Sequence, residues 1–586
     1  MISLKLANIL TNIVEIKKSY SGSKEDIISL MNAARTLRDD PAIIERIIKG
    51  EDHNNLNGID RYCYTLIVEY LEKGRIEEYE YLAPSYSENL IKFIRITGLG
   101  RKRIFGIYDY FGIKDIDDLK DIFEGKTDKD IIKSIGPGKD LLTPLFIERI
   151  QRSLKYYEGL ADKTPRWPVE FFANKMIISL GNHKDIKKAQ LTGSIRRKKS
   201  LIEDIDILVL PEFNDGIYDF DKSICLLKDI EKLPFIKKLV SIKKEKNDIS
   251  AVYETIYEIN TEIIIAGDRT WTWQLFTTTG NRKHLFKLKE YAKVNKVYDL
   301  EKLACTGLCS DEDIYKILGL DYIPIELRQG RDEIELSSKN RLPDLVKMDD
   351  IKGDFHIHSK WSDGLIEYSD IIDIAKKQNY EYIAISDHSV SNYYGNGLDI
   401  ERLLEKMSFM KELRKKYDGI DILMGGEIDI RKPGVFDYPP EIIRKLDIAI
   451  ASLHSSFANS GQQNTARVVS ALEKDYFDLY AHPTGRMFGN RAPLSIDMDR
   501  IIEASVKYGK ALEINSYYMR MDLDEENTRK AREAGAVFAV NTDSHRPGNM
   551  EMMQLGVDLA RRAGLEAKDI INTMTAEELR SWREDR

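Results

Sequence analysis

Six of the chain's nine histidines lie between positions 356 and 545, and each follows an apolar run that predicts a buried β-strand. Successive parallel strands bring their carboxyl ends together on one face of a (β/α) barrel. Imidazole and carboxylate groups are the ligands of divalent metals such as Zn²⁺, Mn²⁺ and Fe²⁺. A lone histidine after a strand is usually a core residue, but nine polar residues at this position in seven successive βα units predict a multinuclear metal centre. The nine are His356, His358, Asp363, His388, Glu427, His454, His482, Asp543 and His545.

The spacing within GDFHIHSKWSDG supports this interpretation. Residues i and i+2 of a strand point to the same face, so His356 and His358 can bind one metal. Asp363 then arrives from the following loop, and Asp543 and His545 share a face in the same way. Arg486 follows the His482 motif and is a candidate phosphate ligand by charge and position, with a structural salt bridge as the alternative.

These motifs resemble the PHP (polymerase and histidinol phosphatase) family over roughly residues 351–586. The resemblance implies a distorted (β/α)₇ barrel and a hydrolytic phosphoesterase site that holds up to three metals, Mn²⁺ or Zn²⁺ or both. By analogy, the first metal would be bound by His356, His358, Glu427 and Asp543. Glu427 would bridge to a second metal, which His454 and His482 would also bind, while Asp363, His388 and His545 would hold the third.

Length and composition predict an ordinary multidomain protein. Single cores rarely exceed about 250–300 residues, and this chain has 586, with 42% hydrophobic and 32% charged residues. No apolar run approaches the roughly 20 residues that span a bilayer, and the first 20 residues lack a signal-peptide layout. Four cysteines in so long a chain predict a reducing cytoplasm instead of a disulfide framework.

Two segments, 94–113 and 134–150, have the pattern of helix-hairpin-helix motifs, in which a glycine turn opens a helix. Such a turn lets backbone N–H groups approach a DNA phosphate without base contacts. The net charge of −8 does not exclude nucleic acid, because local basic clusters decide binding. The candidate DNA-binding residues are Gly98, Gly100, Gly136 and Gly138.

A nucleotide site is predicted in LTGSIRRKKSLIEDIDILVL, residues 191–210. Gly193 and Ser194 follow an apolar strand end, and Arg197 comes shortly after, which suits a triphosphate. Asp204 and Asp206 lie on an expected strand and face one way, an arrangement that binds Mg²⁺ in nucleotidyl transfer.

Together with the hairpins, this segment resembles DNA polymerase family X of the bacterial and archaeal kind with an attached PHP domain. The segment 319–335 resembles the end of that family's thumb, so the resemblance covers nearly the whole chain. It implies a third catalytic carboxylate 18 residues before Gly280, where this chain has Glu262 in place of aspartate. The same turn has Thr277 and Thr278 and lacks the family's phenylalanine. A deoxyribose-phosphate lyase is not expected, because Leu66 occupies the position of its lysine nucleophile.

The expected fold is therefore an α-helical N-terminal and helix-hairpin-helix region, an α/β nucleotidyltransferase palm with a thumb, and a C-terminal distorted (β/α)₇ barrel. We place the helical domain at residues 1–90, the hairpins at 91–160, the palm at 161–284, the thumb at 285–330, a linker at 331–350 and the barrel at 351–586.

The leading hypothesis is a cytoplasmic, monomeric DNA repair enzyme with two active sites. The palm would fill gaps as a DNA-directed polymerase with Mg²⁺ and deoxynucleoside triphosphates, with its activity impaired by Glu262. The barrel would act as a 3′–5′ exonuclease or abasic-site phosphodiesterase on gapped or damaged duplex DNA. An alternative is a nuclease that uses a weak polymerase half only as a DNA-binding scaffold. A third, a small-molecule phosphatase, leaves the hairpins unexplained.

Overall fold

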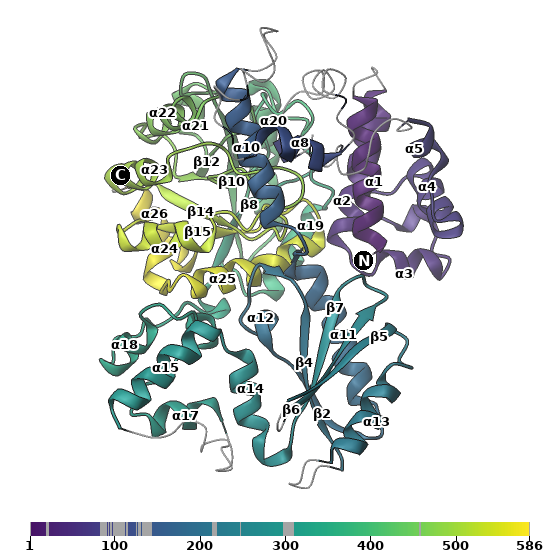
Figure 1. The fold of residues 1–586 in the computed structure, drawn as a ribbon. Coiled ribbons are helices and arrows are strands. Elements are labelled where there is room, and N and C mark those ends of the chain that lie inside the picture. The colour runs from purple at the N-terminus through teal and green to yellow at the C-terminus, as the bar shows by residue number, and fades with distance from the viewer. Residues whose placement is uncertain are drawn as a thin grey trace. The chain divides into compact units, whose positions relative to one another are not determined.

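A computed structural model of the chain describes residues 2–18, 23–82, 91, 93, 96–97, 112, 115–124, 126, 131, 143–213, 219–245, 248–296, 310–455 and 459–584. The chain divides into two compact units (Figure 1). The first consists mainly of residues 162–346 and 558–566, and the second of residues 2–161, 347–557 and 567–586. Each unit has a hydrophobic core of its own.

The amino-terminal region of the second unit is helical, which confirms the prediction. Its apolar residues recur at helical spacing, and Leu6, Leu10, Leu30 and Leu37 are fully buried in one core. Ser23 begins the second helix by accepting hydrogen bonds from two backbone N–H groups of the first turn. The helices are α1 (Ile2–Lys17), α2 (Lys24–Asp39), α3 (Ile43–Ile48), α4 (Arg61–Lys73), α5 (Glu77–Leu82), α8 (Ile116–Phe123) and α10 (Pro144–Gly159), with the 3₁₀ turn η1 (His53–Asn55).

The first unit contains a five-stranded mixed sheet in the order β2-β4-β7-β6-β5. β4 and β7 are parallel, and the other neighbours are antiparallel. The strands are β2 (Ile186–Leu191), β4 (Ile205–Pro211), β5 (Ile236–Glu245), β6 (Asp248–Thr255) and β7 (Asn260–Ile265), with the short pair β1 (Thr164–Pro165) and β3 (Leu201–Ile202). The helices are α11 (Arg166–Gly181), α12 (Gly193–Arg196), α13 (Phe220–Ile230), α14 (Trp271–Thr279), α15 (Arg282–Val294), α17 (Asp311–Ile317) and α18 (Glu333–Ser338), with η2 (Asp268–Thr270) and η3 (Ile325–Leu327).

Part of the segment expected as a linker is folded into the first unit. The α18 helix begins at Glu333, whose buried Oε1 lies 2.7 Å from Nδ1 of His284 on α15. A buried carboxylate needs such a hydrogen-bond partner, because an isolated buried charge is costly. The polar composition of this segment therefore reflects a buried histidine–carboxylate contact as well as exposure.

The carboxyl-terminal part of the second unit is a nearly closed barrel of seven parallel strands, as the sequence predicts. The strand order is β15-β14-β13-β12-β10-β9-β8. The strands are β8 (Gly353–Ile357), β9 (Tyr382–Ile385), β10 (Asp421–Arg431), β12 (Ile448–Ser452), β13 (Leu479–Tyr480), β14 (Ala511–Asn515) and β15 (Phe538–Asn541), and β11 (Val435–Phe436) pairs only with β10. The remaining helices are α19 (Tyr368–Lys377), α20 (Ile400–Lys416), α21 (Pro440–Ile443), α22 (Gly461–Leu472), α23 (Met498–Tyr508), α24 (Glu525–Glu533), α25 (Met553–Arg562) and α26 (Ala576–Glu584), with η4 (Met348–Asp350), η5 (Pro547–Met552), η6 (Ala567–Asp569) and η7 (Ile571–Thr573).

Hydrogen bonds between the first strand and the segment after the last strand bring the barrel edges together. Ser544 donates its backbone N–H to the carbonyl of His356 at 3.0 Å, and His358 donates to the carbonyl of Ser544 at 2.8 Å. This pairing places the two histidines of β8 directly beside Asp543 and His545. Closure of the barrel is therefore what joins the two ends of the predicted ligand set.

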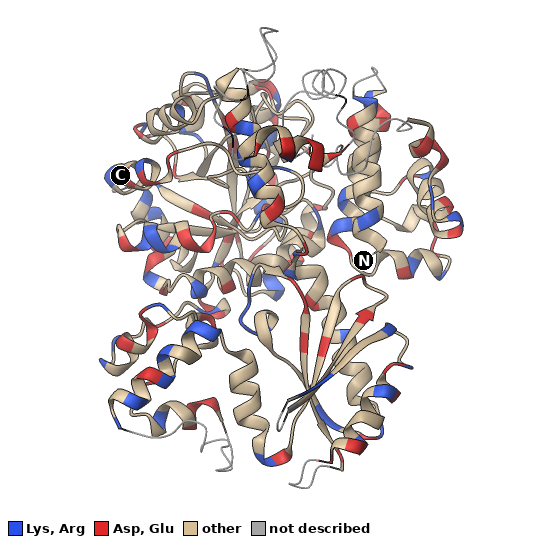
Figure 2. Cartoon of the chain, in the orientation of Figure 1, with Lys and Arg blue, Asp and Glu red and all other residues tan. Residues whose placement is uncertain are grey.

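Basic and acidic residues alternate along the helices of both units (Figure 2). Within the described part of the chain, no helix has the length and apolar character needed to cross a membrane.

Candidate metal centre and carboxylate cluster

The predicted metal ligands lie at the carboxyl ends of the barrel strands. His356 is the penultimate residue of β8, and His358 follows that strand directly. The other histidines stand two to four residues beyond β9, β12, β13 and β15, whereas Glu427 lies within the long strand β10. All nine side chains are brought to one site.

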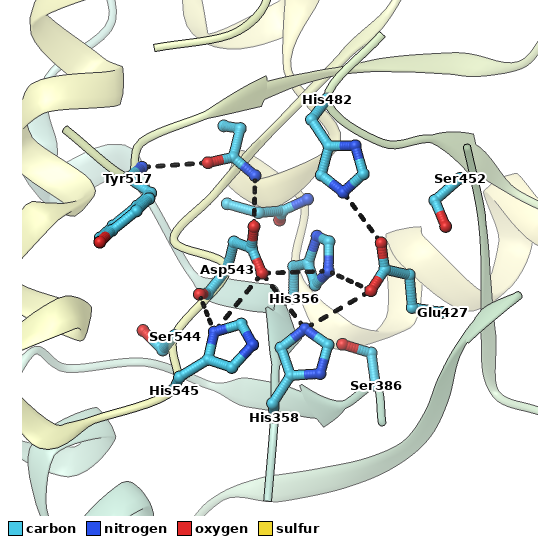
Figure 3. Close-up of polar contacts among 12 residues, drawn as sticks. His356, His358, Ser386, Glu427, Ser452, His482, Tyr517, Asp543, Ser544 and His545 are labelled. Carbon is cyan, nitrogen blue, oxygen red and sulfur yellow. Dashed lines mark hydrogen bonds and ion pairs between the residues drawn. The ribbon is translucent and has the colours of Figure 1, made fainter. Parts of the chain in front are cut away.

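Glu427 contacts several imidazoles of this site, and Figure 3 shows its contacts with His356, His358 and His482. Its Oε1 lies 2.9 Å from Nε2 of His482 and 3.3 Å from Nε2 of His454. Its Oε2 lies 2.7 Å from Nδ1 of His388, and 3.4 and 3.6 Å from the Nε2 atoms of His356 and His358. One carboxylate thus presents each oxygen to a different group of imidazoles, which is the geometry of a bridging ligand.

A second carboxylate group serves the remaining histidines. Asp363 Oδ1 lies 3.2 Å from Nε2 of His545 and 3.4 Å from Nε2 of His388. Asp543 Oδ1 lies 3.2 Å from Nε2 of His358. Four overlapping sets of barrel side chains place their ligand atoms within 4.8 Å of one another. The sets are His358, Asp363, His388 and His545; His356, His358 and Asp543; His356, Glu427 and His482; and His388, Glu427 and His454.

The charges of these buried groups are coupled. Burial alone would raise the pKa of Glu427, but the imidazoles of His454, His388 and His356 hold it well below its usual range. Burial opposes protonation of His388, yet the neighbouring carboxylates of Glu427 and Asp363 raise its pKa to about 9. Anionic carboxylates are therefore favoured in the site, as metal coordination requires.

Several polar atoms at this site are buried and have no hydrogen-bond partner. They include Nε2 of His356, Nδ1 and Nε2 of His358, Oδ1 of Asp363, Nδ1 of His388 and Oε2 of Glu427. Burying a polar atom without a hydrogen-bond partner costs free energy, so the presence of several such atoms at one site requires an explanation. These atoms are imidazole nitrogens and carboxylate oxygens, and this set of ligand atoms fits Zn²⁺ or Mn²⁺.

Two ligands have unusual backbone conformations. His482 has φ of 30° and Asp543 has φ of 53°, both in the left-handed region that non-glycine residues rarely adopt. Each costs on the order of 1–3 kcal/mol, and such strain is concentrated at functional sites. Here it turns the two side chains back over the strand ends, where Figure 3 shows them pointing to the cluster.

The first unit contains a separate cluster of carboxylates. β4 begins at Ile205, so Asp204 stands just before the strand instead of within it. Asp206 is paired across the parallel strands with Glu262 on β7. Burial and the adjacent carboxylates of Asp204 and Glu262 raise the pKa of Asp206 to about 7. Burial and mutual repulsion make these carboxylates candidate ligands for a divalent cation.

The predicted nucleotide-binding residues pack against that cluster. A side chain at Gly193, which has φ of +62°, would overlap Oδ2 of Asp206, so glycine is required for this approach. The Oγ atom of Ser194 is buried without a hydrogen-bond partner. Arg197 donates to the backbone carbonyl of Thr279, one residue before Gly280. The loop after β2 and the turn after α14 therefore meet beside the carboxylates.

The four hairpin glycines, at positions 98, 100, 136 and 138, lie outside the described residues. Their role in DNA binding stays a prediction.

The barrel and the whole chain have recognisable relatives. A family model described as the PHP domain matches residues 354–517. A DNA polymerase/3′-5′ exonuclease PolX of Bacillus subtilis (strain 168) is 30% identical over 562 residues, covering 94% of this chain and 93% of that protein. The chain belongs to the PolX family.

Other similarities of this PolX family member are limited to part of the chain. A probable phosphatase of Thermoanaerobacter sp. (strain X514) is 30% identical over 226 residues, which cover 35% of this chain and 84% of that protein. A crystal structure of histidinol phosphate phosphatase from Lactococcus lactis is 17% identical with a TM-score of 0.30, and covers 37% of this chain and 94% of that chain.

Two positively charged residues near the barrel site have different surroundings. Arg486 Nε donates to the carbonyl of Arg520 at 2.7 Å, and its other nitrogens approach the carbonyl of Met521 and the carboxylate of Asp524. Arg520, which sequence reasoning missed, places Nε 3.1 Å from Oδ2 of Asp543, and its buried Nη1 has no hydrogen-bond partner. Arg486 thus supports the loop that holds Arg520 beside Asp543, a predicted metal ligand.

Glu513 on β14 was also missed. Its Oε1 lies 2.7 Å from Nδ1 of His356, and its Oε2 accepts the backbone N–H of His482 at 2.7 Å. A carboxylate that accepts the Nδ1 proton leaves Nε2 of His356 unprotonated for a metal. A charged residue inside the apolar strand ALEIN was the signal available in the sequence.

Replacing Glu513 with glutamine is expected to weaken metal binding about 10- to 100-fold, because orienting carboxylates of metal-bound histidines contribute on that scale. Titration of the metal-free protein with Mn²⁺ and Zn²⁺ measures the effect. Glu503→Gln on the exposed face of α23 is the matched control. Equal affinities of the Glu513 variant and the unmodified protein would show that Glu513 does not orient a ligand.

Proposed function

We propose that the chain is a DNA repair enzyme with a metal-dependent 3′–5′ exonuclease in the barrel and a gap-filling DNA polymerase in the first unit. Its substrates are then gapped or damaged duplex DNA with a 3′ end and deoxynucleoside triphosphates, and its place is the cytoplasm. The observation that carries the proposal is the convergence of nine unsatisfied or ion-paired ligand groups at the strand ends of the barrel. Relationship to PolX over 94% of the chain supports a nucleic-acid substrate.

In the barrel, His356, His358, Glu427 and Asp543 would hold one metal, His454 and His482 a second one with Glu427, and Asp363, His388 and His545 a third. When bound, such metals lower the pKa of water towards neutrality and stabilise charge on the leaving oxygen. Glu427 would hold one group of imidazoles at each of its two carboxylate oxygens. Glu513 would orient the ring of His356. Arg520 would contact a substrate phosphate, since its Nη1 has no hydrogen-bond partner.

In the first unit, Asp204, Asp206 and Glu262 would hold Mg²⁺ and the primer end, with Gly193, Ser194, Arg197 and Gly280 around the triphosphate. The Arg197 guanidinium would offset the negative charge of the phosphates, and the Ser194 hydroxyl would donate a hydrogen bond to a phosphate oxygen. Glu262 Oε1 accepts a hydrogen bond from Ser250 at 2.7 Å, which fixes the carboxylate relative to Asp206.

Glutamate at position 262 favours a second candidate, in which the polymerase half serves as a DNA-binding scaffold with little activity. The extra methylene displaces the carboxylate oxygens by more than an ångström relative to aspartate, and displacement on that scale can cost about 10²-fold in rate. Primer extension on a gapped duplex, in Mg²⁺ and in Mn²⁺, distinguishes the two candidates.

Changing Glu262 to aspartate is expected to raise the rate of primer extension on the order of 10-fold, with a smaller change in apparent nucleotide affinity. A misplaced catalytic base weakens stabilisation of the transition state more than binding of the substrate, so the rate changes more than the nucleotide affinity. Single-turnover incorporation at several nucleotide concentrations separates the two effects, and Glu212→Asp at an exposed position just after β4 is the matched control. A slower Asp variant would show that the site has adapted to glutamate.

A further inference from the structure

The helix α2 of the amino-terminal region packs on the barrel loops that carry metal ligands. Tyr517, which follows β14, donates its hydroxyl to Oδ1 of Asp39 at 2.7 Å. Asn549, four residues after His545, donates to Oδ2 of Asp39 at 3.1 Å. Arg546 donates to the backbone carbonyl of Asn32 at 2.7 Å. These bonds fix one face of α2 against the loops after β14 and β15.

Arg35 lies on that same face, because it is three residues after Asn32 and four before Asp39. Its Nη1 is 3.5 Å from Oδ2 of Asp363, a predicted ligand of the third metal. Asp543 also attracts the guanidinium. Within the described part of the chain this ion pair is the only polar contact of Arg35, and its side chain keeps 27% of its exposure.

We infer that Arg35 binds the scissile phosphate at the metal centre, so that the amino-terminal helical region supplies part of the nuclease site. A guanidinium has five N–H donors in a planar fork suited to phosphate oxygens. If Arg35 served only to pair with Asp363, a normal hydrogen-bond distance would be expected between them. The observed separation of 3.5 Å leaves N–H donors of Arg35 available to a ligand. Arg35 would then complement Arg520, which borders Asp543.

This inference rests on the proposed phosphodiesterase activity, and it is tested in the full-length protein loaded with Mn²⁺. One probe is thymidine 5′-p-nitrophenyl phosphate, whose hydrolysis releases p-nitrophenolate and thymidine 5′-monophosphate. It has no DNA strand to engage other regions. The second probe is thymidine 5′-monophosphate itself, whose binding is measured by calorimetry and needs no turnover.

Arg35→Ala is expected to lower kcat/KM for the ester and to weaken monophosphate binding, each by roughly 10- to 100-fold, with unchanged metal content by elemental analysis. Arg35→Lys should recover only part of this loss, because lysine lacks the planar fork. Arg46→Ala is the matched arginine control, since Arg46 pairs with Glu51 and Asp40 within the helical region. Asn57→Ala removes a docking bond to the carbonyl of Leu365 without touching Arg35.

Unchanged monophosphate affinity in Arg35→Ala would overturn the inference, as would a loss of bound metal in that variant. An equal defect in Asn57→Ala would also overturn it, because docking alone would then explain the effect. If the unmodified protein binds the monophosphate but does not hydrolyse the ester, the proposed phosphodiesterase activity is wrong. The monophosphate affinities of the unmodified protein and Arg35→Ala then still decide whether Arg35 binds phosphate.

Discussion

Replacing His356 and His358 together with alanine is expected to lower 3′–5′ exonuclease activity by roughly a thousandfold or more. Both imidazoles face Oε2 of Glu427 and Oδ1 of Asp543, so the change removes two nitrogen ligands from the centre of the site. Without the metal, neither the lowered pKa of water nor the stabilisation of the leaving oxygen is available. Degradation of a 5′-labelled duplex measures the loss.

DNA affinity of the double variant should stay within about twofold of the unmodified protein, because phosphate contacts elsewhere determine nonspecific binding. Elemental analysis should show a loss of bound metal. His53→Ala, in the helical region outside the cluster, is the control for a histidine substitution. Full nuclease activity in the double variant would exclude the barrel as the nuclease site.

Replacing Asp206 with asparagine is expected to reduce nucleotide incorporation by roughly a thousandfold, with exonuclease activity unchanged. Asparagine keeps the size of the side chain and its fit against Gly193, but it removes the charge that a cation requires. Asp206 lies directly opposite Glu262 on the neighbouring strand, so the change affects the middle of the carboxylate cluster.

Single-nucleotide gap filling measures this second prediction, and Asp221→Asn on α13 is a matched control outside the cluster. Loss of incorporation with intact nuclease activity supports two independent sites. Incorporation at the normal rate would show that Asp206 is not a metal ligand. If the unmodified protein itself extends no primer in either metal, the scaffold hypothesis replaces the polymerase.

The candidate metal ligands of the barrel stand out in the sequence because most of them lie at the end of an apolar strand or within a few residues after it. The topology then brings these positions together, so residues as distant as His356 and Asp543 meet without any local signal joining them. In the same way, the parallel pairing of β4 and β7 places Glu262 beside Asp206.

Other features depend on long-range packing that local patterns do not encode. Glu513 lies in a strand that is otherwise a buried apolar run, and its role depends on His356, 157 positions away. Arg35 has no distinguishing motif, and its position next to Asp363 follows only from how α2 packs on the barrel. Some polar residues of the predicted linker are exposed, whereas Glu333 is buried against His284. Composition alone does not distinguish these two cases.

The central claim, that two separate metal sites carry out opposite reactions on a DNA 3′ end, is tested most directly on one substrate. A 5′-labelled primer in a single-nucleotide gap is incubated with the unmodified protein, the His356/His358 double variant and Asp206→Asn, with and without nucleotides. The double variant should only lengthen the primer, Asp206→Asn should only shorten it, and the unmodified protein should do both. Shortening by the double variant, or lengthening by Asp206→Asn, would contradict the assignment of the two activities to these sites.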